Sequence, residues 1–260
     1  MKKRLIKSAL ALYFLHSATS FASVNPPESK SEKQILEVGL INQGRYPYFV
    51  NSPRQASNRG IYIDLLNQVG KMTNIEFKYK FLPQPRIRHL MKYQKLDVEP
   101  GIDMGWRTEE RETENSVYTL PFYESEEVIV YRKTSLSFIP TKELDFEALS
   151  SCSMSGFHDM DIALKDVDIT AESVSLTMME LGRCDYTLMP KVVLNAKGKL
   201  SDHLDITSTI KTYDLRIRLA KKHEHFVPKI NQAISTLISD GYIDKLFASY
   251  IQEGEEYDSI

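Results

Sequence analysis

Residues 61–82 read IYIDLLNQVGKMTNIEFKYKFL, and they predict an α-helix that is followed directly by a β-strand. Between Leu65 and Met72 the apolar residues recur at the spacing of one helical face. From Ile75 the pattern changes to alternation of apolar and charged residues, which is typical of a strand with one buried face. The apolar run ILEVGLI at 35–41 predicts a buried strand before the helix. A strand, a helix and a strand in this order indicate an α/β fold with a parallel sheet.

A second series of strands and helices follows the first. We expect strands at 151–156 and 184–190, with a helix over 172–182 between them, and two final helices that are split by Asp240-Gly241. The other expected strands are 126–132, 203–210, 214–222 and part of 96–106, and the other expected helices are 86–93, 145–149 and 159–164. Two runs of alternating strands and helices predict two α/β lobes.

The N-terminal segment has the organisation of a secretory signal peptide. It reads MKKRLIKSALALYFLHSATSFA, with a basic head, an apolar run from Ala9 to Leu15 and a small-x-small end at Ala22. A membrane-spanning anchor is the alternative, but the apolar run is shorter than the roughly 20 residues that a spanning helix needs. We therefore expect cleavage near Ala22, a signal peptide over 1–22, a periplasmic protein and a flexible polar leader over 23–34.

The charge of the mature chain excludes some partners. The whole chain has 33 basic and 35 acidic side chains and a net charge of −2, which becomes −6 when the four basic residues of the signal peptide are removed. A mildly acidic protein without a basic stripe is a poor candidate for binding nucleic acid or an anionic membrane surface.

The chain has two cysteines, Cys152 and Cys184, and each begins an apolar run that reads as a strand. In an oxidising compartment an even pair favours a disulfide, and parallel neighbouring strands would bring both cysteines to the same sheet edge. Two free thiols are the alternative. A metal site is not expected, because neither cysteine has a second Cys or His at ligand spacing.

Seven short motifs occur in a fixed order along the chain. They are Pro47-Tyr48-Phe49, Gly60-Ile61-Tyr62-Ile63-Asp64-Leu65, Pro85-Arg86, Leu96-Asp97-Val98, Arg107-Thr108-Glu109-Glu110-Arg111, Tyr118-Thr119-Leu120-Pro121-Phe122-Tyr123 and Leu237-Ile238-Ser239-Asp240-Gly241-Tyr242-Ile243. Each motif alone is weak, but their order and spacing are specific. Over about residues 35–251 the chain resembles the family-3 extracellular solute-binding proteins, the periplasmic receptors that supply polar amino acids to ABC importers.

The resemblance implies a type II periplasmic binding protein fold, in which two crossing strands join two α/β lobes and the ligand lies in the cleft between them. It places lobe 1 at 35–130 and 216–260, and lobe 2 at 131–215. It also implies a small carboxylate-bearing solute as the ligand, an ABC permease or a membrane sensor as the partner, no cofactor and a monomeric protein. Closure of the lobes around a ligand would give a shape that a membrane partner can recognise.

Arg111 is the residue that the resemblance makes the anchor of the ligand carboxylate. It ends the Thr108-Glu109-Glu110-Arg111 turn, and a guanidinium binds a carboxylate through two parallel hydrogen bonds. A solvated arginine in a charged loop is the alternative. Arg107 lies in the same turn, and we expect it to lie off the ligand position.

Aromatic residues are further ligand candidates. Trp106 stands where the family often has a small hydroxyl residue, and it is expected to form an apolar or stacking wall of the cleft. Tyr46 and Tyr48 lie where the family places an aromatic lid. Each of the three has a place in the hydrophobic core as its alternative.

The second lobe and the helix after the second strand contribute the remaining candidates. Arg86 is a possible second anion contact or an ordinary surface charge. Phe157 and His158 follow Gly156 in the turn where the family completes the carboxylate site with backbone N–H groups. The stretch from Leu188 to Lys191 has no carboxylate to accept an α-ammonium, so a carboxylate ligand without the amine, or one that is bound differently, fits this comparison better.

Two rival functions remain open on the sequence. A periplasmic dehydratase on the same fold would need an acid or base in the cleft, and no recognisable catalytic motif supports one, so we expect a protein that is not an enzyme. A ligand sensor for a membrane receptor would need the same closing cleft as a transport protein. The sequence does not separate sensing from transport.

Overall fold

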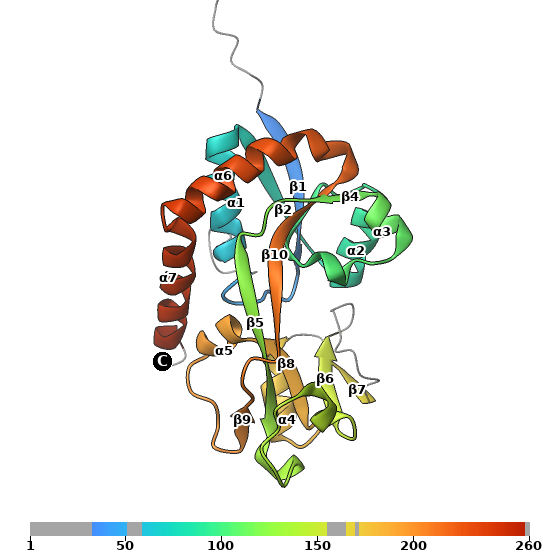
Figure 1. Ribbon diagram of the computed structural model, residues 1–260, viewed down its shortest axis with the longest axis vertical. Coiled ribbons are helices and arrows are strands. Elements are labelled where there is room, and N and C mark those ends of the chain that lie inside the picture. The colour runs from blue at the N-terminus through green and yellow to red at the C-terminus, as the bar shows by residue number, and fades with distance from the viewer. Residues whose placement is uncertain (1–32, 51–58, 155–164, 170–171, 258–260) are drawn as a thin grey trace, which may run out of the picture. The chain divides into compact units, whose positions relative to one another are not determined.

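The computed structural model describes residues 33–50, 59–154, 165–169 and 172–257, and these residues form the predicted α/β fold (Figure 1). The strands follow the order β2-β1-β3-β10-β5-β8-β6-β7, with β4 paired to β10 and β9 paired to β5. The strands of the first lobe are β1 (Gln34–Ile41), β2 (Ile75–Leu82), β3 (Val98–Ile102), β4 (Ser116–Tyr118) and the second half of β10 (Lys211–Ala220). The predicted signal peptide and most of the predicted leader lie outside the described residues.

The helix–strand unit predicted from residues 61–82 is present in the first lobe. α1 (Ile61–Thr73) connects β1 to β2, and the two strands are parallel along their whole length, from Gln34 opposite Ile75 to Ile41 opposite Leu82. The inward side chains of β1 and α1 are buried, and each such aliphatic side chain contributes about 1.5–3 kcal/mol of hydrophobic stabilisation. α2 (Gln84–Lys92) then returns the chain to β3, which is buried over its whole length.

The second lobe repeats the arrangement with shorter elements. Its strands are β5 (Tyr123–Arg132), β6 (Ser150–Met154), β7 (Lys165–Ile169), β8 (Tyr186–Pro190) and β9 (Leu204–Ile206). β6 is parallel to both β7 and β8. The helices of this lobe are α4 (Glu172–Glu180) and α5 (Lys191–Asn195), with 3-10 turns at Lys133–Ser135 and Glu143–Phe146.

Two strands, β5 and β10, run from one lobe into the other. The first half of β10 pairs with β5, and the second half pairs with β3 and β4. β5 continues into the second lobe, where it pairs with β8 and β9. These are the crossing strands of the expected type II fold. The lobe limits at 130/131 and 215/216 stay predictions.

The chain ends in two helices that pack on the first lobe. A 3-10 turn (Lys221–Phe226) leads into α6 (Val227–Ser239), and α7 (Tyr242–Tyr257) follows after Gly241. Gly241 has a φ of +65°, a left-handed conformation that favours glycine, and it lets the chain turn between the helices. Figure 1 shows α7 running beside β5 toward α5. None of the described helices is both long and apolar enough to cross a membrane.

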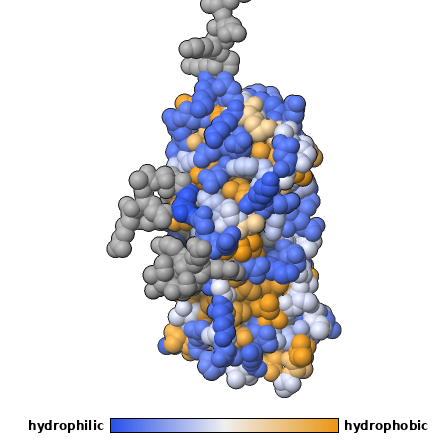
Figure 2. Space-filling view, turned by 90° about the vertical axis from the view of Figure 1, so that its left-hand side faces the viewer, coloured by the Kyte–Doolittle hydropathy of each residue, from blue (hydrophilic) through white to orange (hydrophobic). Residues whose placement is uncertain are grey.

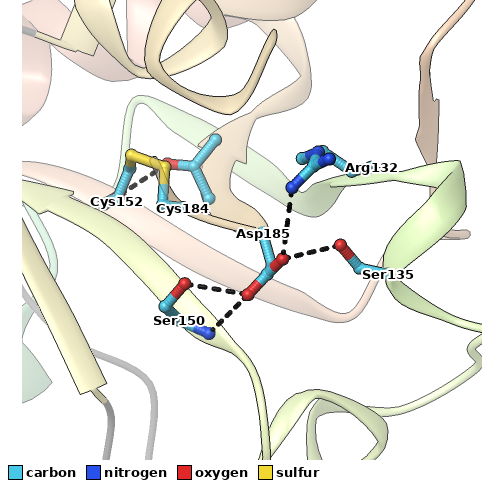
Figure 3. The surroundings of a disulfide bond; sticks show 7 residues. Arg132, Ser135, Ser150, Cys152, Cys184 and Asp185 are labelled. Atoms are coloured by element: carbon cyan, nitrogen blue, oxygen red, sulfur yellow. Dashed lines mark hydrogen bonds and ion pairs between the residues drawn. A yellow bond between two sulfur atoms is a disulfide. The ribbon is translucent and has the colours of Figure 1, made fainter. Parts of the chain in front are cut away.

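The predicted disulfide is confirmed. Cys152 in β6 and Cys184 before β8 are bonded, with their Cα atoms 5.6 Å apart (Figure 3). Next to it, the carboxylate of Asp185 accepts hydrogen bonds from the hydroxyls of Ser135 and Ser150 and from the Ser150 backbone N–H. Burial would raise the pKa of Asp185, but these donors and the Arg132 charge lower it. The disulfide and this carboxylate together fix the starts of β6 and β8.

Several expected elements differ from the structure. β7 was not expected, since its sequence KDVDI has no apolar run. The strand expected over 203–210 is confined to β9, and the helix expected over 145–149 is a 3-10 turn at Glu143–Phe146. The helix expected over 159–164 lies outside the described residues.

On the face shown in Figure 2, hydrophilic side chains cover most of the upper half, whereas hydrophobic ones gather in the lower half.

Candidate ligand-binding cleft

A cavity of about 120 Å³ lies where the two lobes meet. In the first lobe it is lined by the carboxyl ends of β1 and β3, by the loop after β1 and by the first turn of α2. In the second lobe β6 and β8 line it, and the crossing strands β5 and β10 complete it. The carboxyl edge of a parallel sheet is the usual position of a ligand site in α/β proteins, because loops and strand ends converge there.

Four charged residues line this cavity among the described part of the chain, and they are Arg45, Glu99, Arg107 and Glu127. Glu99 accepts hydrogen bonds from Arg107 Nη2 at 2.9 Å and from Arg218 Nη1 at 2.8 Å. Burial alone would raise the pKa of Glu99, but the charges of Arg107 and Arg218 lower it to about 2. The Glu99 carboxylate is therefore ionised at neutral pH, and its charge is compensated within the first lobe.

Glu127 brings a second carboxylate to the cavity from the crossing strand β5. Its side chain is almost fully buried, and it accepts a hydrogen bond from Ser125 Oγ at 2.8 Å. Tyr48 lies near both Glu127 and Arg45: the pKa of its hydroxyl is raised mainly by burial, then by Tyr62, while Arg45 lowers it and Glu127 raises it. A positive and a negative group thus lie around one buried tyrosine of the lining.

Aromatic rings form much of the cavity wall. The aromatic lining residues are Tyr48, Phe49, Tyr62, Trp106, Tyr186 and Tyr213. Tyr48 stacks on Tyr62 with a centroid distance of 4.7 Å, and Trp106 meets Tyr213 edge to face at 4.9 Å. Such faces bury a large apolar area and also attract cations.

The structure brings only part of the predicted site together. Tyr48 and Trp106 are in the cavity lining, as expected of an aromatic lid and wall. Tyr46 is not in the lining, and its hydroxyl donates to the backbone carbonyl of Tyr250 on α7 at 2.5 Å. Arg86 and Thr108 are exposed and also lie outside the lining. The predicted Phe157 and His158 lie outside the described residues.

The two arginines of the charged turn are placed differently from the expectation. Arg111, in α3 (Glu110–Glu114), is exposed, and its guanidinium lies 5.1 Å from the ring centre of Tyr93 rather than in the lining. Arg107, which we expected off the ligand position, lies in the lining directly after the 3-10 turn Met104–Trp106. The ligand role of Arg111 and the expectation that Arg107 lies off the ligand position therefore both stay predictions, although Arg107 lines the cavity and Arg111 does not.

Glu127, Tyr186 and Tyr213 are among the lining residues with polar side chains that the sequence did not predict. Glu127 belongs to a run that reads as a strand, and only the pairing of β5 with β8 and β10 decides which face of the sheet it occupies. Tyr213 and Tyr186 also lie on strands whose buried faces the sequence did not identify. Arg107 directly follows Trp106 in the chain, and this was the one signal in the sequence that could have pointed to Arg107 as a lining residue.

The sequence matches the bacterial extracellular solute-binding proteins, family 3, over residues 38–253. The chain belongs to this family. It is therefore a solute-binding protein and not an enzyme. No curated protein sequence is significantly similar to it.

Solved structures of related fold agree with this membership. The substrate-binding protein AbpA of an amino-acid ABC transporter from Streptococcus pneumoniae, bound to L-arginine, is 15% identical with a TM-score of 0.69, and the match covers 85% of this chain and 96% of that one. The GluR0 ligand-binding core with L-glutamate is 12% identical with a TM-score of 0.70, covering 85% and 99%. A histidine kinase sensor domain is 14% identical with a TM-score of 0.67, covering 84% and 96%. These likenesses show the type II fold of the solute-binding protein.

Proposed function

We propose that this solute-binding protein is exported, captures a small carboxylate-bearing solute in the cavity between its lobes and delivers it to an ABC importer. The cavity is the observation that carries the proposal, since both lobes and both crossing strands line it. A solute bound there contacts both halves and therefore favours their closed arrangement. The fold shared with a binding protein of an amino-acid ABC transporter supports the partner.

Arg107 is the anchor for the carboxylate that the geometry favours. Its side chain is 3% exposed, and it donates from Nη1 to the Trp106 carbonyl and from Nη2 to Glu99, which hold the guanidinium in one orientation at the cavity wall. A fixed guanidinium loses little conformational entropy when it binds an anion. Arg111 is the competing anchor, on the strength of its position in the family motif, and its side chain would have to leave Tyr93 to reach the cavity.

Glu127 favours a solute that carries a cationic group as well. An anionic group of the solute can pair with a guanidinium group, since Arg45 and Arg107 line the same cavity. An ammonium or guanidinium group would instead find a carboxylate and aromatic faces. We therefore extend the proposal to amino-acid-like solutes, although the strand from Tyr186 to Pro190 offers no acidic residue.

A thermal-shift screen tests the proposal. The panel consists of amino acids, keto acids, dicarboxylates and polyamines, each added to the purified protein. A solute at a hundred times its dissociation constant stabilises the fold by roughly 2.7 kcal/mol, which is a readily visible shift. The proposal is supported if at least one carboxylate of the panel stabilises the protein. It is contradicted if none of the carboxylates does. Export is tested separately by mass spectrometry of the exported protein, which should begin near Ser23.

Ligand sensing for a membrane receptor is the second candidate function. Its support is the likeness to a histidine kinase sensor domain. A deletion strain separates the two: loss of uptake of the bound solute indicates transport, whereas normal uptake with a lost transcriptional response indicates sensing.

A further inference from the structure

The C-terminal helix α7 is attached to the loop that carries the aromatic lining of the cavity. The Tyr46 hydroxyl donates to the Tyr250 carbonyl, and the two rings meet edge to face at 6.3 Å. Arg59 forms an ion pair with Glu253 and lies over the Tyr250 ring, 5.4 Å from its centre. One turn of α7 thus contacts both Tyr46, in the loop after β1, and Arg59, directly before Gly60.

The hydroxyl of Tyr250 makes the most buried of these attachments. It accepts a hydrogen bond from the Gly60 backbone N–H at 2.9 Å and donates to Asp64 Oδ2 at 2.7 Å. Burial and the neighbouring Asp64 carboxylate raise the pKa of Tyr250 to about 12, so the hydroxyl keeps its proton at neutral pH. Gly60 immediately precedes α1 and has no side chain to cap the helix, and Tyr250 satisfies its N–H from outside.

Gly60 in turn fixes the residues that line the cavity. A Cβ atom at this position would lie 2.4 Å from Phe49 Cα and 2.5 Å from the Tyr48 carbonyl oxygen, so the backbones are in close contact. The Gly60 φ of +132° also favours glycine. Beyond it, the Tyr62 N–H donates to the Tyr48 carbonyl at 2.9 Å, and the two rings stack. A shift of Gly60 would therefore shift Tyr48 and Phe49.

The same helix contacts the crossing strand and the second lobe. Phe247 stacks on Tyr123, the first residue of β5, at a centroid distance of 3.7 Å. α7 also packs against α5, as Figure 1 shows. One helix thus connects the aromatic loop, a crossing strand and a helix of the second lobe.

We infer that Tyr250 is a positioning residue of the cavity: through its hydroxyl, α7 holds the loop from Arg45 to Phe49 in the arrangement that lines the site. The functional meaning of this inference rests on the proposed binding of a solute in the cavity. Tyr250 itself does not line the cavity and acts through Gly60.

Hydrogen exchange and tryptophan quenching test this inference without any solute. Tyr250→Phe removes the hydroxyl and keeps the ring. Loss of the two hydrogen bonds of this hydroxyl should speed amide exchange in residues 42–50 at least about fivefold, while β6 and β8 remain unchanged. Trp106 is the only tryptophan and lines the same cavity, so its fluorescence should become easier to quench with acrylamide.

Tyr79→Phe is the matched control. The Tyr79 hydroxyl also lies within hydrogen-bonding distance of two acceptors on α1, the Ile63 carbonyl at 3.1 Å and Asn67 Oδ1 at 2.9 Å, and it contacts neither α7 nor the loop through them. In Tyr79→Phe, the rate of amide exchange in residues 42–50 and the acrylamide quenching of Trp106 should match those of the wild type. If Tyr250→Phe does not fold, Glu253→Gln weakens the neighbouring contact of α7 with Arg59, and a smaller change in the same direction is expected.

Unchanged exchange in residues 42–50 in the folded variant would overturn the inference, as would an equal increase in Tyr79→Phe. Faster exchange with unchanged quenching of Trp106 would also overturn it, because α7 would then hold the loop without shaping the cavity. Neither readout needs a bound solute, so a failed ligand screen would contradict only the proposed function.

Discussion

Arg107 and Glu99 form a buried ion pair in the wall of the cavity, with 2.9 Å between Nη2 and Oε1 and side chains that are 3% and 4% exposed. Glu99 also forms an ion pair with Arg218, which does not line the cavity. Arg218 in turn pairs with the buried Glu112, and Glu112 pairs with Arg88. Breaking such a pair leaves an uncompensated charge in a region of low dielectric constant. The anion-binding wall and the stability of the first lobe therefore depend on the same charges.

Glu99→Gln should destabilise the fold by about 3 kcal/mol at neutral pH, the equivalent of a pKa lowered from 4.5 to about 2. A lowered carboxyl pKa stabilises the folded state above the unfolded-state pKa, and this contribution is lost as the pH falls toward the folded-state value. The deficit of the variant should therefore shrink between about pH 4.5 and pH 2. Urea unfolding at several pH values measures it.

Glu126→Gln is the control, because Glu126 is exposed and bonds Lys191 and Thr209 at the surface. It should change stability little. If the loss of stability in Glu99→Gln stays constant from pH 7 to pH 2, the charge of Glu99 is not the cause of that loss.

Removal of the disulfide by the double change Cys152→Ser and Cys184→Ser should cost about 3 to 4 kcal/mol, because the bond closes a loop with a sequence separation of 32. Cys152 also lines the cavity, so solute affinity should fall as well. Urea unfolding with and without reductant measures the first effect. If reductant leaves the wild-type midpoint unchanged although the thiols are shown to be free, the bond contributes nothing to stability.

The sequence predicted the fold better than the site. The helix–strand unit at 61–82 was predictable because its apolar period changes at one point, and the disulfide was predictable because each cysteine begins an apolar run of the sequence. β7 was not, because KDVDI is short and three of its five residues are charged, so it reads as a polar segment, although it lies at the edge of a sheet.

The cavity lining depended on information that a linear pattern does not contain. Trp106 and Tyr48 were placed in it by the motif order, whereas Tyr46 turns toward α7 and Arg111 toward Tyr93. Glu127 and Tyr213 face the cavity because of strand register, which long-range pairing sets. Arg107 is buried because the carboxylate of Glu99 compensates its charge.

Glu127→Gln should change which solutes bind. For a solute with an amine, the dissociation constant should rise about tenfold or more, because a charge-assisted hydrogen bond is lost. The matching solute without the amine should bind as before or better. Calorimetry on such a pair measures the change, with Glu126→Gln on the same strand as the control. An equal response of both solutes would mean that Glu127 does not face the cationic group.

Arg107→Lys should weaken binding of a carboxylate at least tenfold, because a point charge cannot replace the two-pronged guanidinium. Arg218→Lys is the matched control, since Arg218 is equally buried and also binds Glu99 but does not line the cavity. Both should lose similar stability, and only Arg107→Lys should lose affinity. Arg111→Ala should change affinity less than about threefold. The reverse order would assign the anchor to Arg111, as the family motif predicts.

The most direct measurement is calorimetric titration of the purified protein with the best carboxylate of the panel and with its neutral amide. We expect one binding site per chain for the carboxylate. We also expect at least a hundredfold weaker binding of the amide, because a neutral amide cannot accept the charge-assisted hydrogen bonds that a carboxylate accepts from the buried arginine. Equal binding of acid and amide would contradict capture through a carboxylate in this cavity.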